Sequence, residues 1–342
     1  SNARANGDFS MAVGTNSYAE ERYATAVGTG AYAGYQGTSL GISAAARGKA
    51  ATSLGADSAV WAPGGVAVGG YAYVGRYAAN ATALGYAAYA AGYASAALGS
   101  NAVASGVSAV ALGDSTIAQG DYSLAAGPFA VATGESSTAV GDTATAIANN
   151  ATAVGSNAYA SGDGSIALGN GATSVGGNDI AVGNGAATGG SGGNNIAIGA
   201  GAYAGSAYGG NIAIGQNARA AGAGKYTTAI GRNASADGKY AMAVGNGAAA
   251  SNNLSMAVGA RATAAGSVST AVGEYSTAGD AGATAIGAFT YATAAETTAL
   301  GFSAFATGRS ATALGENAHA TAYATAVGAI GVTFIIVTCA PE

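Results

Sequence analysis

Small, apolar and turn-forming residues recur along this chain in a unit of about 14 residues. A glycine returns from Gly14 to Gly328, and 16 of the 22 intervals between these glycines are 14 residues long. Each interval contains two halves of the form Gly-x-x-Ala-x-Ala-x, as in residues 141–155. Because strand side chains alternate between two faces, each half predicts a strand of about five residues followed by a tight turn. The fixed period predicts a solenoid whose coils stack on their neighbours.

The main competing interpretation is a helical repeat, since alanine favours helices. A glycine about every seven residues would cost about 1 kcal/mol each in a helix, and the period-2 alternation between the glycines favours strands. We expect the glycines to turn the chain where φ is positive or where no side chain fits. With one strand spacing of about 4.8 Å per coil, the array would be a rod on the order of 105 Å long.

The outward positions of the two halves differ in polarity. The residue before the repeating glycine is Val, Leu or Ile in 22 of 23 cases, with Ala126 as the exception, whereas the matching place in the first half is mixed and mostly small or polar. Since alanine fills the thin interior, the apolar stripe needs a partner surface, which predicts a homo-oligomer. The expected interface residues are Val13, Leu84, Leu112, Val154, Ile198, Ile214, Ile230, Val258 and Leu314. The reversed assignment, a monomer with these side chains inside, stays open at this point.

Residues for catalysis are nearly absent. The single histidine, His319, is expected on an exposed face, and the single cysteine, Cys339, lies outside the repeats. One His and one Cys give no zinc set and no nucleophilic pair, and the acids do not recur at every turn as in calcium-binding rolls. A net charge of −5 with 8% charged residues gives no basic face for nucleic acid. We therefore expect no enzymatic activity, no cofactor, no metal and no nucleic-acid partner. No window is long and apolar enough for a membrane-spanning helix.

Aromatic residues recur at the middle outward position of the first half. Rigid amphipathic rings make good protein contacts, so these positions are candidate ligand contacts, although they could equally cover neighbouring coils. The candidates are Tyr18, Tyr89, Tyr159, Tyr203, Tyr291 and Phe305.

The repeats resemble the head repeats of trimeric autotransporter adhesins of Gram-negative bacteria, whose type case is YadA. Residues 194–199, Asn-Asn-Ile-Ala-Ile-Gly, and residues 211–215, Asn-Ile-Ala-Ile-Gly, carry the resemblance, with some twenty variants such as residues 151–155. The resemblance implies an all-β, left-handed parallel β-roll in which three chains associate through their apolar faces. It also implies a surface that binds host cells or matrix proteins such as collagen.

We expect three segments. Residues 1–9 comprise the remnant of an expression tag and a lead-in, residues 10–328 form the head repeat array, and residues 329–342 form a capping strand or an artefact of expression. Three consecutive 16-residue coils between Gly183 and Gly231 insert extra Gly, Asn, Ser and Tyr residues. The family's neck, stalk and C-terminal membrane barrel have no counterpart, so the chain is expected to be a head fragment.

The predicted function is multivalent attachment at the bacterial cell surface. The resemblance implies export and anchoring to the outer membrane by the absent barrel, with no membrane contact by the fragment. Two alternatives remain at this stage. One is a monomeric ice-binding or surface-layer β-solenoid, because Thr recurs in Ala-Thr-Ala segments, and the other is a passive structural spacer.

Overall fold

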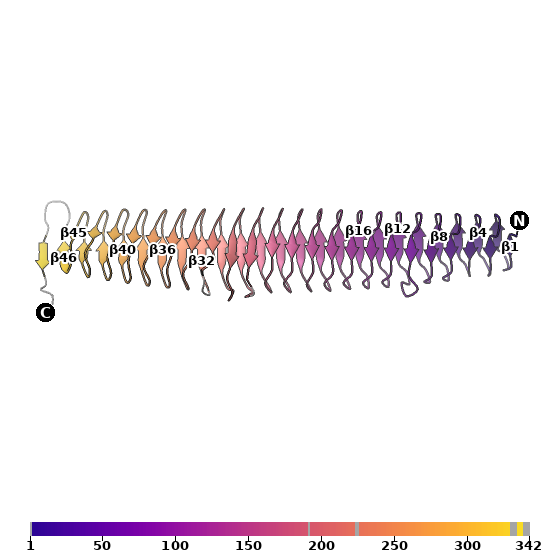
Figure 1. The fold of residues 1–342 in the computed structure, drawn as a ribbon, viewed down its shortest axis with the longest axis horizontal. Coiled ribbons are helices and arrows are strands. Elements are labelled where there is room, and N and C mark those ends of the chain that lie inside the picture. Colours follow the sequence, from indigo (N-terminus) through magenta and orange to yellow (C-terminus); the bar gives the residue numbers. More distant parts are fainter. Residues whose placement is uncertain (1, 191, 223–225, 329–333, 338–342) are drawn as a thin grey trace. The chain divides into compact units, whose positions relative to one another are not determined.

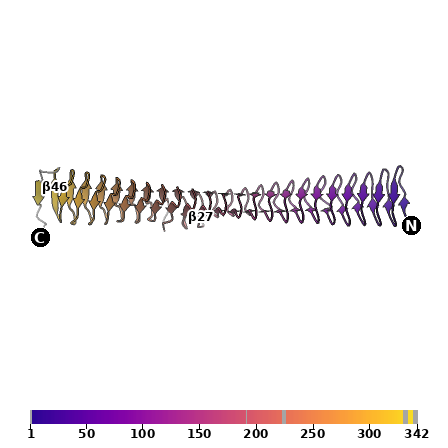
Figure 2. The same cartoon turned by 90° about the horizontal axis from the view of Figure 1, so that it is seen from above.

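The computed structural model describes residues 2–190, 192–222, 226–328 and 334–337. The chain divides into two compact units, residues 1–171 and residues 172–342. In each unit the strands alternate along the chain between two parallel sheets, called sheet A and sheet B (Figures 1 and 2). The all-β solenoid expected from the sequence is therefore confirmed.

Sheet A of the first unit contains the odd-numbered strands β1 (Arg4–Ala5), β3 (Tyr18–Ala19), β5 (Tyr32–Ala33), β7 (Ala45–Ala46), β9 (Ala59–Val60), β11 (Tyr73–Val74), β13 (Tyr89–Ala90), β15 (Val103–Ala104), β17 (Ile117–Ala118), β19 (Val131–Ala132), β21 (Thr145–Ala146) and β23 (Tyr159–Ala160). Sheet B of the first unit contains the even-numbered strands β2 (Met11–Val13), β4 (Thr25–Val27), β6 (Thr38–Leu40), β8 (Thr52–Leu54), β10 (Val66–Val68), β12 (Thr82–Leu84), β14 (Ala96–Leu98), β16 (Val110–Leu112), β18 (Leu124–Ala126), β20 (Thr138–Val140), β22 (Thr152–Val154) and β24 (Ile166–Leu168).

Sheet A of the second unit contains β25 (Thr173–Ser174), β27 (Ala187–Gly189), β29 (Tyr203–Gly205), β31 (Arg219–Ala220), β33 (Ser235–Ala236), β35 (Ala249–Ala250), β37 (Thr263–Ala264), β39 (Thr277–Ala278), β41 (Tyr291–Ala292), β43 (Phe305–Ala306) and β45 (His319–Ala320). Sheet B of the second unit contains β26 (Ile180–Val182), β28 (Ile196–Ile198), β30 (Ile212–Ile214), β32 (Thr228–Ile230), β34 (Met242–Val244), β36 (Met256–Val258), β38 (Thr270–Val272), β40 (Thr284–Ile286), β42 (Thr298–Leu300), β44 (Thr312–Leu314), β46 (Ala324–Val327) and β47 (Phe334–Val337).

The strands are shorter than the five residues expected. Those of sheet A have two or three residues, and those of sheet B up to β44 have three. The rest of each half-coil forms a turn, and each turn contains a residue with a left-handed backbone, such as Asn157 with φ of 55° or Asn150 with φ of 56°. The turns themselves are hydrogen-bonded from coil to coil, as where the Asn157 amide donates to the Asp142 carbonyl at 2.9 Å. Backbone pairing therefore continues through residues that are not extended.

The repeating glycines occupy positions that no other residue could fill without strain. Gly155 has φ of 132°, and a Cβ there would lie 2.4 Å from the Gly169 carbonyl oxygen of the next coil. Positive φ and a lack of space for a side chain, both expected from the sequence, are therefore found together, and successive glycines stack in direct backbone contact.

Alanine fills the space between the two sheets. In one coil Ala144, Ala146, Ala151 and Ala153 are all 0% exposed, and the same pattern repeats in both units. The alternative with Val, Leu and Ile inside is wrong, because the alanine methyls of the two sheets already occupy the interior. In the second unit β47 pairs antiparallel with β46, so this part of the C-terminal segment extends sheet B in a direction that ends the parallel stack.

Candidate functional site

The outer face of sheet B carries an apolar stripe in each unit. Each of the nine expected interface residues lies at the last position of a sheet B strand and points outward. Val13, Leu84, Leu112, Ile198, Ile214 and Ile230 are between 36% and 52% exposed, and Val154, Val258 and Leu314 are half-buried. Parallel register stacks them, as in the pairs Leu98↔Leu112 and Ile198↔Ile214. The interior has no room for this stripe, so within one chain it faces solvent.

The outer face of sheet A carries the candidate aromatic residues, but they do not form one continuous ladder. Tyr73 and Tyr89 are stacked with ring centroids 5.3 Å apart, and Tyr291 and Phe305 are stacked at 5.0 Å. Tyr159, in contrast, has Thr145 as its neighbour in register. The candidates therefore occur as pairs and single rings, partly covering adjacent coils. His319 is exposed, as expected, and meets the edge of Phe305 at 6.3 Å.

A second set of side chains, which the sequence did not single out, combines arginine and aromatic rings in the first unit. The Arg47 guanidinium carbon lies 4.7 Å from the centroid of Tyr32 and 4.6 Å from that of Trp61. Arg76 lies 5.4 Å from the same Trp61 ring. We call Arg47, Trp61 and Arg76 the arginine–tryptophan cluster.

A polar ladder lies buried in the second unit, beginning in the coil before Gly183 and continuing through the three 16-residue coils. Asp179, Asn195, Asn211 and Thr227 are all 0% exposed and succeed one another at intervals of 16 residues. The amide of Asn195 donates to Asp179 Oδ1 at 2.7 Å, the amide of Asn211 donates to Asn195 Oδ1 at 3.1 Å, and the amide of Thr227 donates to Asn211 Oδ1 at 3.1 Å. Each side chain thus accepts from the backbone of the next coil.

Further hydrogen bonds complete the ladder. Asn195 Nδ2 donates to the Gly192 carbonyl at 2.6 Å, Asn211 Nδ2 donates to Asn195 Oδ1 at 2.9 Å, and Thr227 Oγ1 donates to Asn211 Oδ1 at 2.7 Å. The Asp179 carboxylate also accepts from the Gly176 amide at 3.0 Å. Burying a polar group costs free energy unless it is hydrogen-bonded. The 16-residue period provides these hydrogen bonds by placing one polar side chain next to the following one in successive coils. This spacing is the signal that sequence reasoning could have used.

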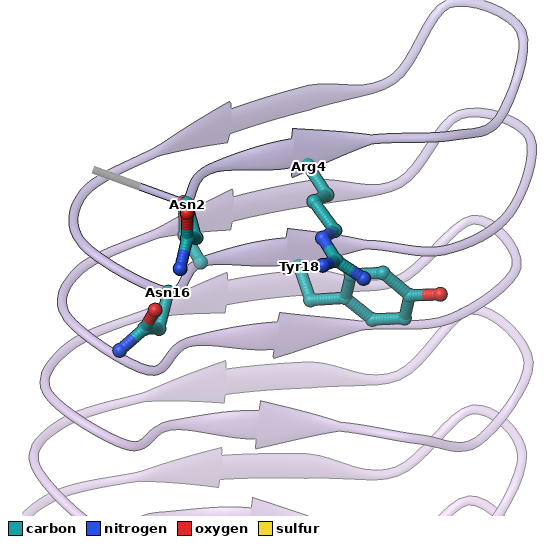
Figure 3. Close-up of a pocket in the computed structure, with 5 residues that line it drawn as sticks. Asn2, Arg4, Asn16 and Tyr18 are labelled. Carbon is teal, nitrogen blue, oxygen red and sulfur yellow. The ribbon is translucent and has the colours of Figure 1, made fainter.

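No arrangement for catalysis or metal binding is found among the described residues. No group of three His, Cys, Asp or Glu side chains in the described ranges is placed to hold a metal ion. A shallow hollow of about 220 Å³ at the start of the first unit is lined by Asn2, Arg4, Asn16, Ser17 and Tyr18, with Arg4 reaching from β1 toward Tyr18 (Figure 3). Asn2 belongs to the segment interpreted as a tag remnant, so we assign the hollow no role. No helix in the described part of the chain is long and apolar enough to cross a membrane.

The fold thus belongs to the class of parallel β-solenoids, with an alanine interior and one outer sheet whose apolar side chains have no cover among the residues that the structure describes. The family model described as "YadA head domain repeat (2 copies)" matches residues 2–31, 78–102, 104–130, 132–158, 160–186, 223–248, 250–276, 269–290 and 306–329. More than half of the chain is matched, and the chain therefore belongs to the YadA head repeat family, the heads of trimeric autotransporter adhesins. None of the curated proteins compared with the chain matches it.

Family membership establishes several earlier predictions. The chain is a non-enzymatic adhesin head, exposed at a cell surface, and the family implies trimerisation. The longer stretches that the matches leave out are residues 32–77, 187–222 and 291–305. The arginine–tryptophan cluster lies in the first of these stretches, and the ladder residues Asn195 and Asn211 lie in the second.

Proposed function

We propose that three copies of this chain assemble through the outer face of sheet B and present sheet A for multivalent attachment to host cells or matrix proteins such as collagen. The observation that carries the proposal is the apolar stripe of sheet B, which stays exposed although the interior is full. In this proposal Val13, Leu84, Leu112, Val154, Ile198, Ile214, Ile230, Val258 and Leu314 form the trimer interface.

Burial of this stripe would supply a large driving force for assembly. Each Val, Leu or Ile side chain contributes about 1.5 kcal/mol or more when fully buried, and the stripe repeats in every coil. A closed three-fold arrangement would bring identical stripes together on one axis. Anchoring to the outer membrane by a further segment of the intact protein is part of the same proposal and is supported by family membership alone.

Sedimentation of paired variants tests the interface. Leu98→Glu with Leu112→Glu places carboxylates on two adjacent sheet B strands, whereas Val103→Glu with Ile117→Glu changes the outer face of sheet A in corresponding coils. We expect the sheet B variant to lose the trimer, because six carboxylates would be buried near one axis. The sheet A variant should remain trimeric. A trimeric sheet B variant, or a monomeric parent chain, would overturn the assignment.

The aromatic positions Tyr18, Tyr89, Tyr159, Tyr203, Tyr291 and Phe305 are the proposed ligand contacts. The stacked pair of Tyr73 and Tyr89 offers the clearest test, since both rings lie on the outer face of sheet A. Tyr73→Ser with Tyr89→Ser should weaken binding to immobilised collagen while the sedimenting mass stays unchanged. Thr263→Ser with Thr277→Ser, in register on sheet A of the second unit, is the control. Equal collagen binding by both double variants would remove this pair from the ligand surface.

A further inference from the structure

We propose that the arginine–tryptophan cluster on sheet A of the first unit is a binding site for sulfated polysaccharide. The inference rests on the proposed function, because it requires that assembly buries sheet B and leaves sheet A in solvent. It adds a ligand class and a location that the family repeat does not supply, since the model match stops at residue 31 and resumes at residue 78.

The geometry of Arg47 carries the first step. Its guanidinium carbon lies between two aromatic rings, 4.7 Å from the centroid of Tyr32 and 4.6 Å from that of Trp61. Stacking holds the guanidinium and leaves its N–H groups free at the edge of the plane. Neither Arg47 nor Arg76 belongs to the two ion pairs found among the described residues, Arg219–Asp237 and Arg309–Glu296. Arg47 is therefore a cation held in place for an anionic ligand, with less rotamer entropy to lose on binding.

Arg76 and Lys49 add two further positive charges beside Arg47. Arg76 is exposed and contacts the same Trp61 ring as Arg47 does. Lys49 is also exposed and lies two residues after Arg47, with its Nζ 5.5 Å from the ring of Tyr35. All three cations lie in the connections that lead from sheet A to sheet B.

The local charge favours an anion despite the net charge of −5. Between residues 41 and 99 the only acidic residue is Asp57, which lies in the opposite turn, between β8 and β9. Toward the C-terminus the next acid, Asp114, lies three coils beyond Arg76, about 14 Å away at 4.8 Å per coil. Toward the N-terminus Glu20 and Glu21 lie two coils before Arg47, about 10 Å away, with Arg22 next to them in the sequence. Both separations exceed the Debye length of about 8 Å at physiological ionic strength. The net charge of the chain therefore does not describe the charge of this segment.

The form of the surface favours a polysaccharide over a peptide. Strand β9 is paired on both sides, with β7 and with β11, so no edge is free for an added peptide strand. A polysaccharide needs no edge. Its sulfate groups would accept hydrogen bonds from the stacked guanidinium, and its sugar rings would pack against exposed rings beside the cations, such as Tyr77 at 87% exposure and Tyr93 at 52%.

Titration of the whole chain with dextran sulfate at physiological ionic strength tests the proposal. Arg47→Ala with Arg76→Ala should weaken binding by about tenfold or more, because two charge-assisted contacts are lost. Arg47→Lys keeps the charge but not the planar fork and should weaken binding by a smaller factor. The control, Arg232→Ala with Lys239→Ala, removes the same charge from exposed residues of the second unit and should bind like the parent chain.

The outcomes separate this site from the proposed function. Binding to dextran sulfate but not to dextran, polyglutamate or single-stranded DNA would support a sulfated polysaccharide. Equal binding to polyglutamate or DNA, or an equal loss in both double variants, would overturn it. Sedimentation of the same samples reports the trimer independently. A trimeric parent chain that does not bind dextran sulfate would refute only this inference. A monomeric parent chain would refute the proposed assembly.

Discussion

The chain lengthens its coil to 16 residues in both units and fills the added interior in opposite ways. In the first unit, where the coil runs from Gly69 to Gly85, the filling is apolar and consists of Val74 and Ala78, with Val60 from the preceding coil, all 0% exposed. In the second unit, between Gly183 and Gly231, it consists of Asn195, Asn211 and Thr227, which continue a hydrogen-bonded ladder that begins at Asp179 in the preceding coil.

The difference follows from the number of successive long coils. A single long coil has no long neighbour with which to share side-chain hydrogen bonds. Apolar side chains therefore fill its added interior, because they leave no polar group unpaired. Gly65 makes room for them, since a Cβ there would lie 2.8 Å from Val60 Cγ1 and 2.9 Å from Val74 Cγ1. In three successive long coils, each polar side chain can form a hydrogen bond with the corresponding residue of the next coil. The larger buried polar side chains of the long coils are therefore satisfied as a continuous ladder, whereas a buried serine of a 14-residue coil, such as Ser269, bonds to a carbonyl of its own turn.

Asn195→Ala should have the largest effect, because Asn195 is the middle of the ladder. It removes the acceptor of the Asn211 amide and of Asn211 Nδ2. Leaving buried donors unsatisfied costs about 1 to 3 kcal/mol each, so we expect the local opening free energy to fall by about 3 kcal/mol or more. Hydrogen exchange of the peptides that span residues 179–227 measures it.

The control for Asn195→Ala is Ala241→Ser, at the equivalent position of a 14-residue coil. Ala241 is buried there, and in the next coil Ser255 Oγ donates to the Asn252 carbonyl at 2.5 Å. Ala241→Ser should therefore change exchange by little. If Asn195→Ala were as mild, the ladder would not be what stabilises the long coils.

Val74→Ala should have the next largest effect, since it empties part of the apolar filling. We expect a loss of about 2 kcal/mol from the missing methyl groups and the remaining cavity. Val103→Ala, on the half-buried outer face of sheet A, should cost less. Because Val60 Cγ1 and Val74 Cγ1 both block a Cβ at Gly65, Gly65→Ala should be destabilising in the parent chain and less so in the Val74→Ala variant, where one of the two contacts is gone. Thermal unfolding of the single and double variants checks the order, and an equal cost of Gly65→Ala in both backgrounds would mean that the two sites do not share one space.

Asp179→Asn should have a smaller effect on the end of the ladder. The two carboxylate oxygens accept from different amides, Oδ1 from Asn195 and Oδ2 from Gly176. An amide has one acceptor oxygen, so one backbone donor would face an NH₂ group, and we expect a loss of about 1 to 2 kcal/mol. Asp163→Asn, an exposed acid one coil earlier, gives the same charge change and should be neutral in urea unfolding. Equal losses would point to net charge as the cause.

The sequence predicted the coil period, the inward alanines and the glycine turns, because each depends on local spacing. The short length of the strands was not predicted, because the repeat pattern does not distinguish extended residues from left-handed turn residues such as Asn157. These turn residues are still hydrogen-bonded to the neighbouring coil. The ladder could have been found from four polar residues at intervals of 16. The stacking of Arg47 between Tyr32 and Trp61 could not, because it depends on side-chain rotamers across three coils.

Ser137→Ala should have the smallest effect and tests whether an isolated buried hydroxyl helps a regular coil. Ser137 is 0% exposed and its Oγ has no hydrogen-bond partner, while the next coil carries Ala151 at this position. Removing an unpaired hydroxyl should leave stability unchanged or raise it by up to about 1 kcal/mol. Ser269→Ala is the matched change, because Ser269 Oγ donates to the Gly266 carbonyl at 2.6 Å, and it should cost about 1 kcal/mol. If Ser137→Ala destabilised the chain as much as Ser269→Ala, the hydrogen bond to Gly266 would not be what makes the Ser269 hydroxyl stabilising, and pairing would not decide which buried polar groups a coil can hold.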